Sequence, residues 1–438
     1  MSLPSTSAEG GMSQFPLDPS IQRGIAAVGF VQPRPIQAQT IPAALDGRDV
    51  LGLAQTGTGK TAAFSLPILE RLVSLRRPGP RALILAPTRE LAIQIHAEIE
   101  ALARFTQVKA ITIFGGVSAA PQIRALRSQP DIIVACPGRL LDLMQQGHVR
   151  LNGIEVLVLD EADHMFDMGF LPSIRRVLAA LPVRRQNLLF SATMPSEVRG
   201  LAQQILNNPH VVELSHSKPA ETIEHALYPV ASHRKVDLLR HLLSNDDFTS
   251  AIVFLRTKHR AKKLALDLGK LGHNAVALQG NMSQPQRERA MSGFREGKFD
   301  ILVATDIAAR GIDVANVSHV INFDVPNTPD AYTHRIGRTG RAERSGKAFT
   351  FVSDEDRTAV RDIERKLGSP IDRRTVAGFE STAGQPLPLR TFERRPNPHA
   401  PAAARPSRNR RGRGNGHSAF ARSGGERRQP AGESPRAR

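Results

Sequence analysis

From about residue 48 onward, short apolar runs alternate with longer stretches whose apolar residues recur at helical spacing. Runs such as ALILAP (82–87) and EVLVLD (155–160) are almost wholly apolar, which is typical of strands buried on both faces of a parallel sheet. The intervening TRELAIQIHAEIEALARF (88–105) has the apolar spacing of one helix face. Repeated units of this kind predict an α/β fold, in which helices cover a mostly parallel sheet.

One break in the alternation divides the chain. Residues 207–220, NNPHVVELSHSKPA, are rich in polar and helix-breaking residues, and the pattern restarts at IEHALYPV (223–230). We therefore expect two α/β domains in tandem. The predicted segments are a flexible N-terminus (1–12), a first domain (13–206), a linker (207–220), a second domain (221–372) and a tail (373–438).

The charge of the chain indicates a polyanionic partner. The 438 residues carry a net charge of +18, and residues 381–438 alone supply +10, from thirteen arginines and three glutamates. Because this segment has few large apolar residues, we expect it to be disordered and to act as a nonspecific nucleic-acid tether. A solubilising tail without a partner is the alternative, as a merely solvated surface is for the whole basic excess.

Cysteine usage and hydropathy indicate the compartment. Cys136 is the single cysteine, which excludes an intrachain disulfide or a cysteine metal cluster and fits a reducing interior. The N-terminal MSLPSTSAEGGMSQF lacks the pattern of a signal peptide, and no apolar run approaches the ~20 residues of a membrane span. We expect a soluble, cytoplasmic protein with no membrane association.

A phosphate-binding loop is indicated at AQTGTGKT (54–61). It follows the strand-like DVLGLA (49–54) and opens the helix-like TAAFSLPILERL (61–72). The match to G-x-x-x-x-G-K-[ST] is loose, because Ala54 occupies the first glycine position. A chance match in a glycine-rich loop is the alternative, but the preceding strand and following helix argue against it.

The chemistry of such a loop assigns each residue a role. Gly57 and Gly59 allow backbone N–H groups to turn onto phosphate oxygens at a helix N-terminus. Lys60 is expected to reach the β- and γ-phosphates, and Thr61 to ligate Mg²⁺.

A second metal-binding carboxylate is expected in LVLDEAD (157–163), where an apolar strand runs into Asp160 and Glu161. The strand places Asp160 at the carboxyl edge of the sheet, beside the phosphate loop. Asp160 would hold Mg²⁺, and Glu161 would position and deprotonate the attacking water. An acidic turn is a common alternative for this motif alone, but not for both motifs together.

Taken together, the motifs resemble those of the DEAD-box ATP-dependent RNA helicases, and look closest to the bacterial RhlE-type branch. The resemblance covers roughly residues 13 to 370 and implies two RecA-like domains. The motifs are GFVQPRPIQ (29–37), AQTGTGKT (54–61), PTREL (87–91), Gly115–Gly116, PGR (137–139), DEAD (160–163), SAT (191–193), ATDIAARGID (304–313) and HRIGRTGR (334–341).

The resemblance implies an ATP site. Within an adenine-recognition segment (13–41), Gln37 would hydrogen-bond adenine, Phe30 would stack on it, and Phe15 would support the pocket. Core packing is the alternative for both phenylalanines. Asp313 would face the ribose or the γ-phosphate region. The phosphate loop would contribute Ala54, Gln55, Thr56, Gly57, Thr58, Gly59, Lys60 and Thr61.

The resemblance also implies coupling to RNA. Ser191 and Thr193 would connect the ATP site to RNA-dependent domain closure through hydrogen bonds near Asp163. The implied RNA contacts are Pro87, Thr88, Arg89, Gly115, Gly116, Gly138 and Arg139 in the first domain, and Arg287, Thr305 and Asp306 in the second.

The run HRIGRTGR contains three arginines that would lie close to one face of a helix. By resemblance, Arg338 and Arg341 reach the γ-phosphate across the domain cleft, and stabilise charge in the transition state. His334 would link the run to the catalytic segment of the first domain. Arg335 is expected to help hold the interface.

Some positions depart from the usual family pattern. Arg34 and Cys136 stand where threonine is usual, and Gln279 and Asn281 where histidine and aspartate are frequent. None of these changes removes an ATP or Mg²⁺ ligand. A thiol at Cys136 donates weakly, so one RNA hydroxyl contact is in doubt.

With no tryptophan and two tyrosines, the chain is poorly supplied for base stacking, so RNA recognition should follow the backbone and the 2′-OH. The expected activity is RNA-stimulated ATP hydrolysis with local, non-processive unwinding of short duplexes and remodelling of RNA–protein complexes. Ribosomal precursors and RNA-degradation complexes are candidate partners. The alternatives are a DNA helicase or translocase on the same core, and a non-catalytic RNA-binding or annealing protein led by the tail.

Overall fold

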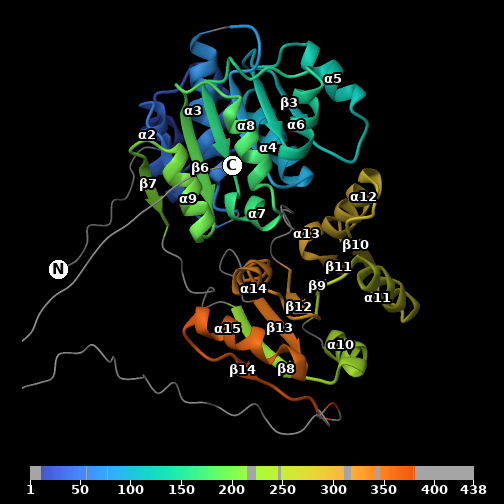
Figure 1. Cartoon of the computed structure of the whole chain (residues 1–438). Helices are drawn as coiled ribbons and strands as arrows, with labels where there is room; N and C mark the ends of the chain where they lie inside the picture. Colours follow the sequence, from blue (N-terminus) through green and yellow to red (C-terminus); the bar gives the residue numbers. More distant parts are fainter. Residues whose placement is uncertain are drawn as a thin grey trace, which may run out of the picture. The chain divides into compact units, whose positions relative to one another are not determined.

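A computed structural model describes residues 11–55, 57–75, 77–214, 223–244, 248–309, 317–340, 346–377 and Phe379. They form two α/β domains, each built on one seven-stranded sheet (Figure 1). All neighbouring strands in both sheets are parallel. The predicted fold class is confirmed.

The first sheet has the spatial order β3 (Ala110–Ile113), β4 (Ile132–Ala135), β2 (Ala82–Leu85), β5 (Val156–Leu159), β6 (Gln186–Ser191), β1 (Val50–Leu53) and β7 (His210–Glu213). The helices of this domain are η1 (Met12–Gln14), α1 (Pro19–Val28), α2 (Pro35–Leu45), α3 (Lys60–Ser74), α4 (Arg89–Leu102), α5 (Ala120–Arg127), α6 (Pro137–Gln145), α7 (Ala162–Asp167), α8 (Leu171–Ala179) and α9 (Ser196–Ile205).

Local sequence explains where these helices begin and end. The carboxylate of Asp18 accepts a hydrogen bond from the Ser20 backbone N–H at 2.8 Å, which caps α1. Pro19 opens that helix, where its missing N–H leaves no intrahelical bond unmade. Gly29 ends it with φ +80°, a left-handed conformation that glycine adopts without strain.

Successive residues of each strand enter opposite cores. In β2, Ala82 and Ile84 pack on one face of the sheet, and Leu83 and Leu85 pack on the other. All four side chains are fully buried. Because helices cover both faces, the strand reads as a continuous apolar run rather than as an alternating one.

The second sheet has the spatial order β10 (Ala275–Leu278), β11 (Ile301–Thr305), β9 (Ala251–Leu255), β12 (His319–Asn322), β13 (Gly346–Val352), β8 (Ile223–Pro229) and β14 (Asp372–Arg373). The helices of this domain are η2 (Ser232–Arg234), α10 (Lys235–Leu243), α11 (Lys258–Lys270), α12 (Gln284–Arg295), α13 (Asp306–Ala309), α14 (Pro329–Ile336), η3 (Asp354–Asp356) and α15 (Arg357–Leu367). It too has a hydrophobic core on each face.

The linker prediction is wrong for His210–Glu213, which form the edge strand β7 and pair with β1. Val212 is buried, whereas Val211 is 53% exposed. A strand with one core-facing apolar side chain, directly after a proline, has too weak a pattern to be recognised from sequence.

The domain ends also differ from the prediction. Met12 lies in η1 and is buried, although the flexible N-terminus was expected to include it. Arg373 belongs to β14, and Val376 and Phe379 pack against the second domain's core. The folded chain therefore continues past residue 372, because β14 extends the sheet there and two apolar side chains after it pack on the core. Residues 1–10, 378 and 380–438 lie outside the described residues.

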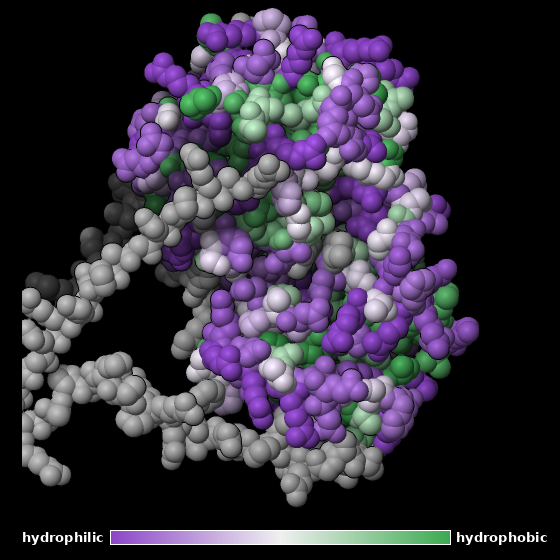
Figure 2. Space-filling view, in the orientation of Figure 1, coloured by the Kyte–Doolittle hydropathy of each residue, from purple (hydrophilic) through white to green (hydrophobic). Residues whose placement is uncertain are grey.

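Hydrophilic side chains cover most of the described surface on the face shown in Figure 2. No helix in the described part of the chain is long and apolar enough to cross a membrane.

We expect Gly24→Ala to destabilise the protein by about 1–3 kcal/mol, because the added Cβ would overpack a close helix contact. A Cβ at Gly24 would lie 2.0 Å from the Leu102 carbonyl oxygen, where α1 crosses α4. Gly200, within α9, is the matched control, since a Cβ there meets nothing within 4 Å. Gly200→Ala should stabilise by about 0.5–1 kcal/mol. Urea unfolding measures both, and equal shifts would contradict the contact.

Candidate functional site

The predicted phosphate loop connects β1 to α3 at the carboxyl edge of the first sheet. Lys60 is the first residue of α3 and is 5% exposed. Its Nζ donates to the carbonyl of Ala54 at 3.0 Å and lies 4.0 Å from Asp160 Oδ1. The Thr58 hydroxyl donates to the Gln55 carbonyl at 2.8 Å, which closes the loop on itself. Thr56 lies outside the described residues.

The two loop glycines have positive φ, +85° at Gly57 and +93° at Gly59. A Cβ at Gly59 would lie 2.6 Å from Gln37 Nε2, so a side chain there has no room. The Gln37 amide bridges two elements: Nε2 donates to the Gly59 carbonyl at 3.1 Å, and Oε1 accepts from the Arg34 N–H at 2.9 Å. The predicted adenine residue therefore holds the start of α2 against the phosphate loop.

The two candidate adenine-site phenylalanines differ in burial. Phe15 is 4% exposed and lies inside the core, so core packing describes its side chain. Phe30 packs against the same core but is half-buried, which leaves part of its ring available for stacking. Asp313 lies outside the described residues.

The two carboxylates that were predicted to be catalytic follow β5 directly. Asp160 is buried, and burial raises the pKa of its carboxyl to about 6 against the opposing effect of Lys60. Glu161 adopts φ +52°, which is unusual for a residue with a side chain and is a conformation found at functional sites. The same turn lets Asp160 Oδ1 accept a hydrogen bond from the Glu161 N–H at 2.9 Å.

Glu161 is held in its ionised form by its neighbours. Burial disfavours its charge, but the positive charges of His164 and Lys60 outweigh burial and lower its pKa. The His164 Nδ1 lies 2.9 Å from Glu161 Oε2, and its Nε2 lies 2.9 Å from Nδ1 of His334. Burial and the neighbouring His164 lower the pKa of His334 to about 3, so His334 is neutral. The His164 ring therefore lies between the Glu161 carboxylate and the His334 ring.

The predicted metal ligands suit Mg²⁺. Asp160 supplies a carboxylate at the sheet edge, and Thr61 supplies a hydroxyl from the phosphate loop. No group of three or more His, Cys, Asp or Glu in the described ranges could hold a metal ion. One carboxylate and one hydroxyl, from Asp160 and Thr61, fit Mg²⁺, which proteins usually bind through one or two carboxylates together with substrate phosphates. Glu98 hydrogen-bonds to Thr61, and burial raises the pKa of Glu98 to about 7.

Three predicted coupling residues lie together. Asp163 Oδ2 accepts hydrogen bonds from both the backbone N–H and the hydroxyl of Thr193, each at 2.9 Å. The Asp163 N–H donates to Ser191 Oγ at 3.2 Å, and that hydroxyl donates to the Thr193 carbonyl at 2.7 Å. These bonds tie the end of β6 to the start of α7.

The arginines of this run do not share one face of a helix, because α14 ends at Ile336 and Gly337 caps it. Arg338 follows in a turn and is 5% exposed, and its charge lowers the pKa of Glu161. Arg341 lies outside the described residues.

The expected interface role of Arg335 is wrong. Its guanidinium is 4% exposed and donates to both carboxylate oxygens of Asp306, at 2.6 and 2.7 Å. It also donates to Asn322 Oδ1 and to the Asp324 carbonyl. A buried charge must find partners, and Arg335 finds all of these within its own domain.

Several predicted RNA contacts of the first domain come together. A Cβ added to Gly116 would lie 2.5 Å from Arg89 Nη1, so the Arg89 guanidinium lies directly against this glycine. Gly116 has φ +76°. The Thr88 hydroxyl accepts from the Leu91 N–H and caps α4. Arg139 donates twice to the Val117 carbonyl, at 3.2 Å. Pro87 is buried, and a Cβ added to Gly115 or to Gly138 would meet nothing within 4 Å.

The predicted contacts of the second domain follow β10 and β11. Arg287 is buried and donates to Glu90 Oε1 at 2.7 Å, to the Gln279 carbonyl at 3.4 Å and to the Ala308 carbonyl at 3.3 Å. Thr305 ends β11 and is 9% exposed. Asp306 follows it and is bound to Arg335, as described above.

Comparison with known proteins assigns the family. The family described as DEAD/DEAH box helicase matches residues 34–201, and the helicase conserved C-terminal domain matches residues 234–343. The ATP-dependent RNA helicase CshA of Bacillus subtilis is 43% identical over 82% of this chain and 73% of its own length. CshA of Listeria monocytogenes is 42% identical over 85% of this chain and 72% of its own length. The chain is a DEAD-box RNA helicase.

A solved structure supports the same assignment. Dbp5 of S. cerevisiae bound to RNA and ADP BeF3 matches the helicase with a TM-score of 0.73 at 34% identity, over 83% of this chain and 95% of that one. The prediction of two RecA-like domains is therefore confirmed.

Three residues near the helicase's nucleotide site were missed from sequence. Arg34 was noted only as a departure, yet its Nη1 donates to the Gly57 carbonyl at 2.7 Å. Glu98 lies on an otherwise ordinary amphipathic helix, and the motifs assign no role to His164. Position directly after DEAD was the one sequence signal for His164.

The remaining departures also have structural counterparts. Cys136 is buried, its side chain makes no capping hydrogen bond for α6, and burial raises its thiol pKa to about 12. Asn281 accepts from Lys258 Nζ at 3.0 Å, and Gln279 Oε1 accepts from the Asn281 N–H at 2.7 Å.

We expect Arg34→Ala to weaken ATP binding by the helicase roughly fivefold, since one charge-assisted hydrogen bond to an exposed loop is worth about 1 kcal/mol. Titration with a fluorescent ATP analogue measures the effect. Arg199, an exposed arginine on α9, provides a matched Arg199→Ala control, which should bind ATP normally. Equal affinity of the Arg34 variant and the control would contradict a role for this contact.

Proposed function

We propose that this helicase hydrolyses ATP in a centre completed by both of its domains, and that RNA stabilises the closed arrangement. The observation that carries the proposal is the hydrogen-bonded series from Glu161 through His164 to His334. It joins the expected general base to the arginine-rich motif of the second domain. RNA binding and ATP hydrolysis would then favour one another as linked equilibria.

Each nucleotide contact has a proposed role. Phe30 would stack on adenine and Gln37 would hydrogen-bond it, with Phe15 supporting the pocket from the core. The phosphate loop and Lys60 would hold the phosphates. Asp313 would face the ribose or γ-phosphate. Arg338 and Arg341 would stabilise the charge that develops on the transferred phosphoryl group, an effect of about 10³–10⁵ in rate in related chemistry.

The proposed base is Glu161. Its lowered pKa keeps it ionised at neutral pH, and its Oε2 lies 2.9 Å from His164 Nδ1. In that state it would orient the attacking water and accept its proton. Thr61 and Asp160 would hold Mg²⁺. When bound, Mg²⁺ would neutralise charge on the β- and γ-phosphates.

RNA would contact the first domain through the segments that carry Arg89, Gly116 and Arg139, and the second through Arg287 and the Thr305–Asp306 turn. The contacts would follow the backbone and 2′-OH, independent of base sequence. Local strand separation of short duplexes, without processive tracking, is the mechanical outcome we propose. Asp163, Ser191 and Thr193 would pass the closure to the ATP site.

The finer biological assignments are proposals from sequence. Membership in the RhlE-type branch rests on the motif sequences, since the relatives compared above carry the name CshA. A cytoplasmic location rests on the single cysteine and the expected RNA substrate. Ribosome assembly and RNA degradation are the processes we propose for its RNA remodelling.

Comparing ATPase stimulation by RNA and by DNA of the same sequence tests the proposal. We expect strong stimulation by RNA and little by DNA. Equal stimulation by DNA would favour the alternative of a DNA translocase.

Glu161→Gln should bind ATP and RNA but barely hydrolyse ATP, because the amide cannot take the water's proton, and it should trap the closed complex. Rapid ATP turnover by Glu161→Gln would exclude this residue as the base.

Deletion of residues 381–438 should leave RNA-stimulated ATPase intact at saturating RNA and weaken RNA affinity at least tenfold at low salt. The deletion removes thirteen arginines, so the salt dependence of binding should also become shallower. A tail of equal length with glutamine in place of arginine separates charge from length. Unchanged affinity in both variants would favour a solubilising role, and absence of RNA-stimulated ATPase from the full-length protein would favour the non-catalytic, tail-led alternative.

A further inference from the structure

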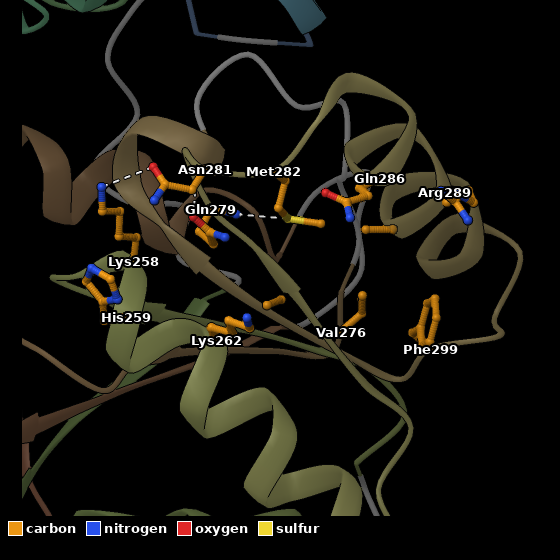
Figure 3. Close-up of a pocket in the computed structure, with 12 residues that line it drawn as sticks. Lys258, His259, Lys262, Val276, Gln279, Asn281, Met282, Gln286, Arg289 and Phe299 are labelled. Atoms are coloured by element: carbon orange, nitrogen blue, oxygen red, sulfur yellow. Dashed lines mark hydrogen bonds between the residues drawn. The ribbon is translucent and has the colours of Figure 1, made fainter.

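The second domain carries a groove remote from the phosphate loop, which we call the α11–α12 groove. It has a volume of about 660 Å³ and lies along the edge strand β10. Lys258 and Lys262 line it from α11, Gln286 and Arg289 line it from α12, and Val276 and Phe299 form its apolar part (Figure 3). The volume is in the range of pockets that hold nucleotide-sized ligands.

The rim of this groove is positively charged and has no acidic counterpart. Lys258, Lys262, His259 and Arg289 are exposed, and no Asp or Glu is among the lining residues. Of the ion pairs formed by described residues, none involves these four side chains. Several other basic side chains of the same domain are paired, as Arg260 is with Asp324 at 2.9 Å. Unpaired cations that converge on a hollow favour an anionic ligand.

The floor of the groove presents an aromatic ring. Phe299 is half-buried and lies against Gly293 of α12, where a Cβ would be 2.5 Å from its Cε2. The missing side chain of Gly293 therefore lets the ring pack directly on the helix. Val276 and Met282 are also half-buried beside the groove. A ring bounded by cations and by carboxamides such as Gln286 suits a nucleobase with its attached phosphates.

The groove continues from the proposed RNA contacts. Arg287 follows Gln286 on α12, but its side chain is buried on another face of the helix, where it donates to the carbonyl of Gln279. Gln279 itself lines the groove. A strand held near Arg287 therefore reaches the groove by crossing the start of α12. An acidic peptide would also match the charge, but it would leave the aromatic floor without a ring to stack on.

We propose that the α11–α12 groove binds a nucleotide of single-stranded RNA that extends beyond the helicase cleft, with the base against Phe299 and the phosphates on Lys262 and Arg289. This inference rests on the RNA-binding function proposed above. The ligand class is a phosphodiester-linked ribonucleotide. The groove adds affinity for longer strands and takes no part in ATP hydrolysis.

The test compares full-length variants on two RNA lengths by fluorescence anisotropy. The double variant Lys262→Glu/Arg289→Glu should bind a single strand of about 16 nucleotides at least tenfold more weakly, and bind one of about 6 nucleotides normally. For this variant, the slope of log affinity against log salt concentration should become shallower by about 1.4, as expected for two lost phosphate contacts. Lys263→Glu/Arg295→Glu is the matched control, since both residues are exposed on the same helices outside the groove.

A second variant tests the aromatic floor without changing charge. Phe299→Leu should lower affinity for the long strand at least threefold. The affinity for a strand with an abasic position facing the groove should be the same with and without this substitution. RNA-stimulated ATPase with the short strand should be unchanged in both variants, which separates failure of this inference from failure of the proposed function. The inference is overturned if the double variant and its control bind the long strand equally, or if the short strand weakens as much. Binding of a poly-glutamate probe that depends on Lys262 and Arg289, without an effect on RNA, would assign the groove to acidic peptides instead.

Discussion

Burial of both faces of each parallel sheet is the constraint on which the rest of the molecule depends. The interior admits apolar side chains from every strand, so polar and charged residues collect where the strands end. Because the strands are parallel, those ends share one edge in each sheet. Asp160 after β5, the loop before Lys60 after β1 and Ser191 at the end of β6 thus gather at one edge of the first domain, although they are far apart in sequence.

Charge at these edges is arranged in two different ways. Arg335 and Arg287 are buried, and their donors are matched to carboxylates and carbonyls. Arg335 ties Asp306 to the end of β12, and Arg287 pairs with Glu90 of the first domain, as a buried charge must be compensated to be tolerated. The cations of the α11–α12 groove are exposed and converge without a carboxylate among the lining residues. An arginine's function therefore follows from its partners rather than from the motif in which it stands.

Backbone geometry prepares the catalytic edge. Glu161 occupies a left-handed conformation, and Gly59 leaves space that Gln37 fills. These local conformations are maintained because hydrogen bonds from Asp160, Gln37 and Arg34 fix the adjoining segments. The network formed by Asp163 and Thr193 then connects this edge to α7. The residues proposed for nucleotide binding, catalysis and coupling thus lie next to one another along this edge, with Lys60 Nζ 4.0 Å from Asp160 Oδ1.

The α/β alternation, the AQTGTGKT and DEAD motifs and the family resemblance could all be predicted from the chain alone, because each depends on short runs of contiguous residues. The tertiary structure decided what depends on residues distant in the chain. It showed that Arg335 is an internal partner of Asp306, that β7 lies within the expected linker, and that Arg34 and Glu98 reach the phosphate loop. The reason is physical: local periodicity encodes strands and helices, whereas the partner of a buried charge is set by which strand ends pack side by side.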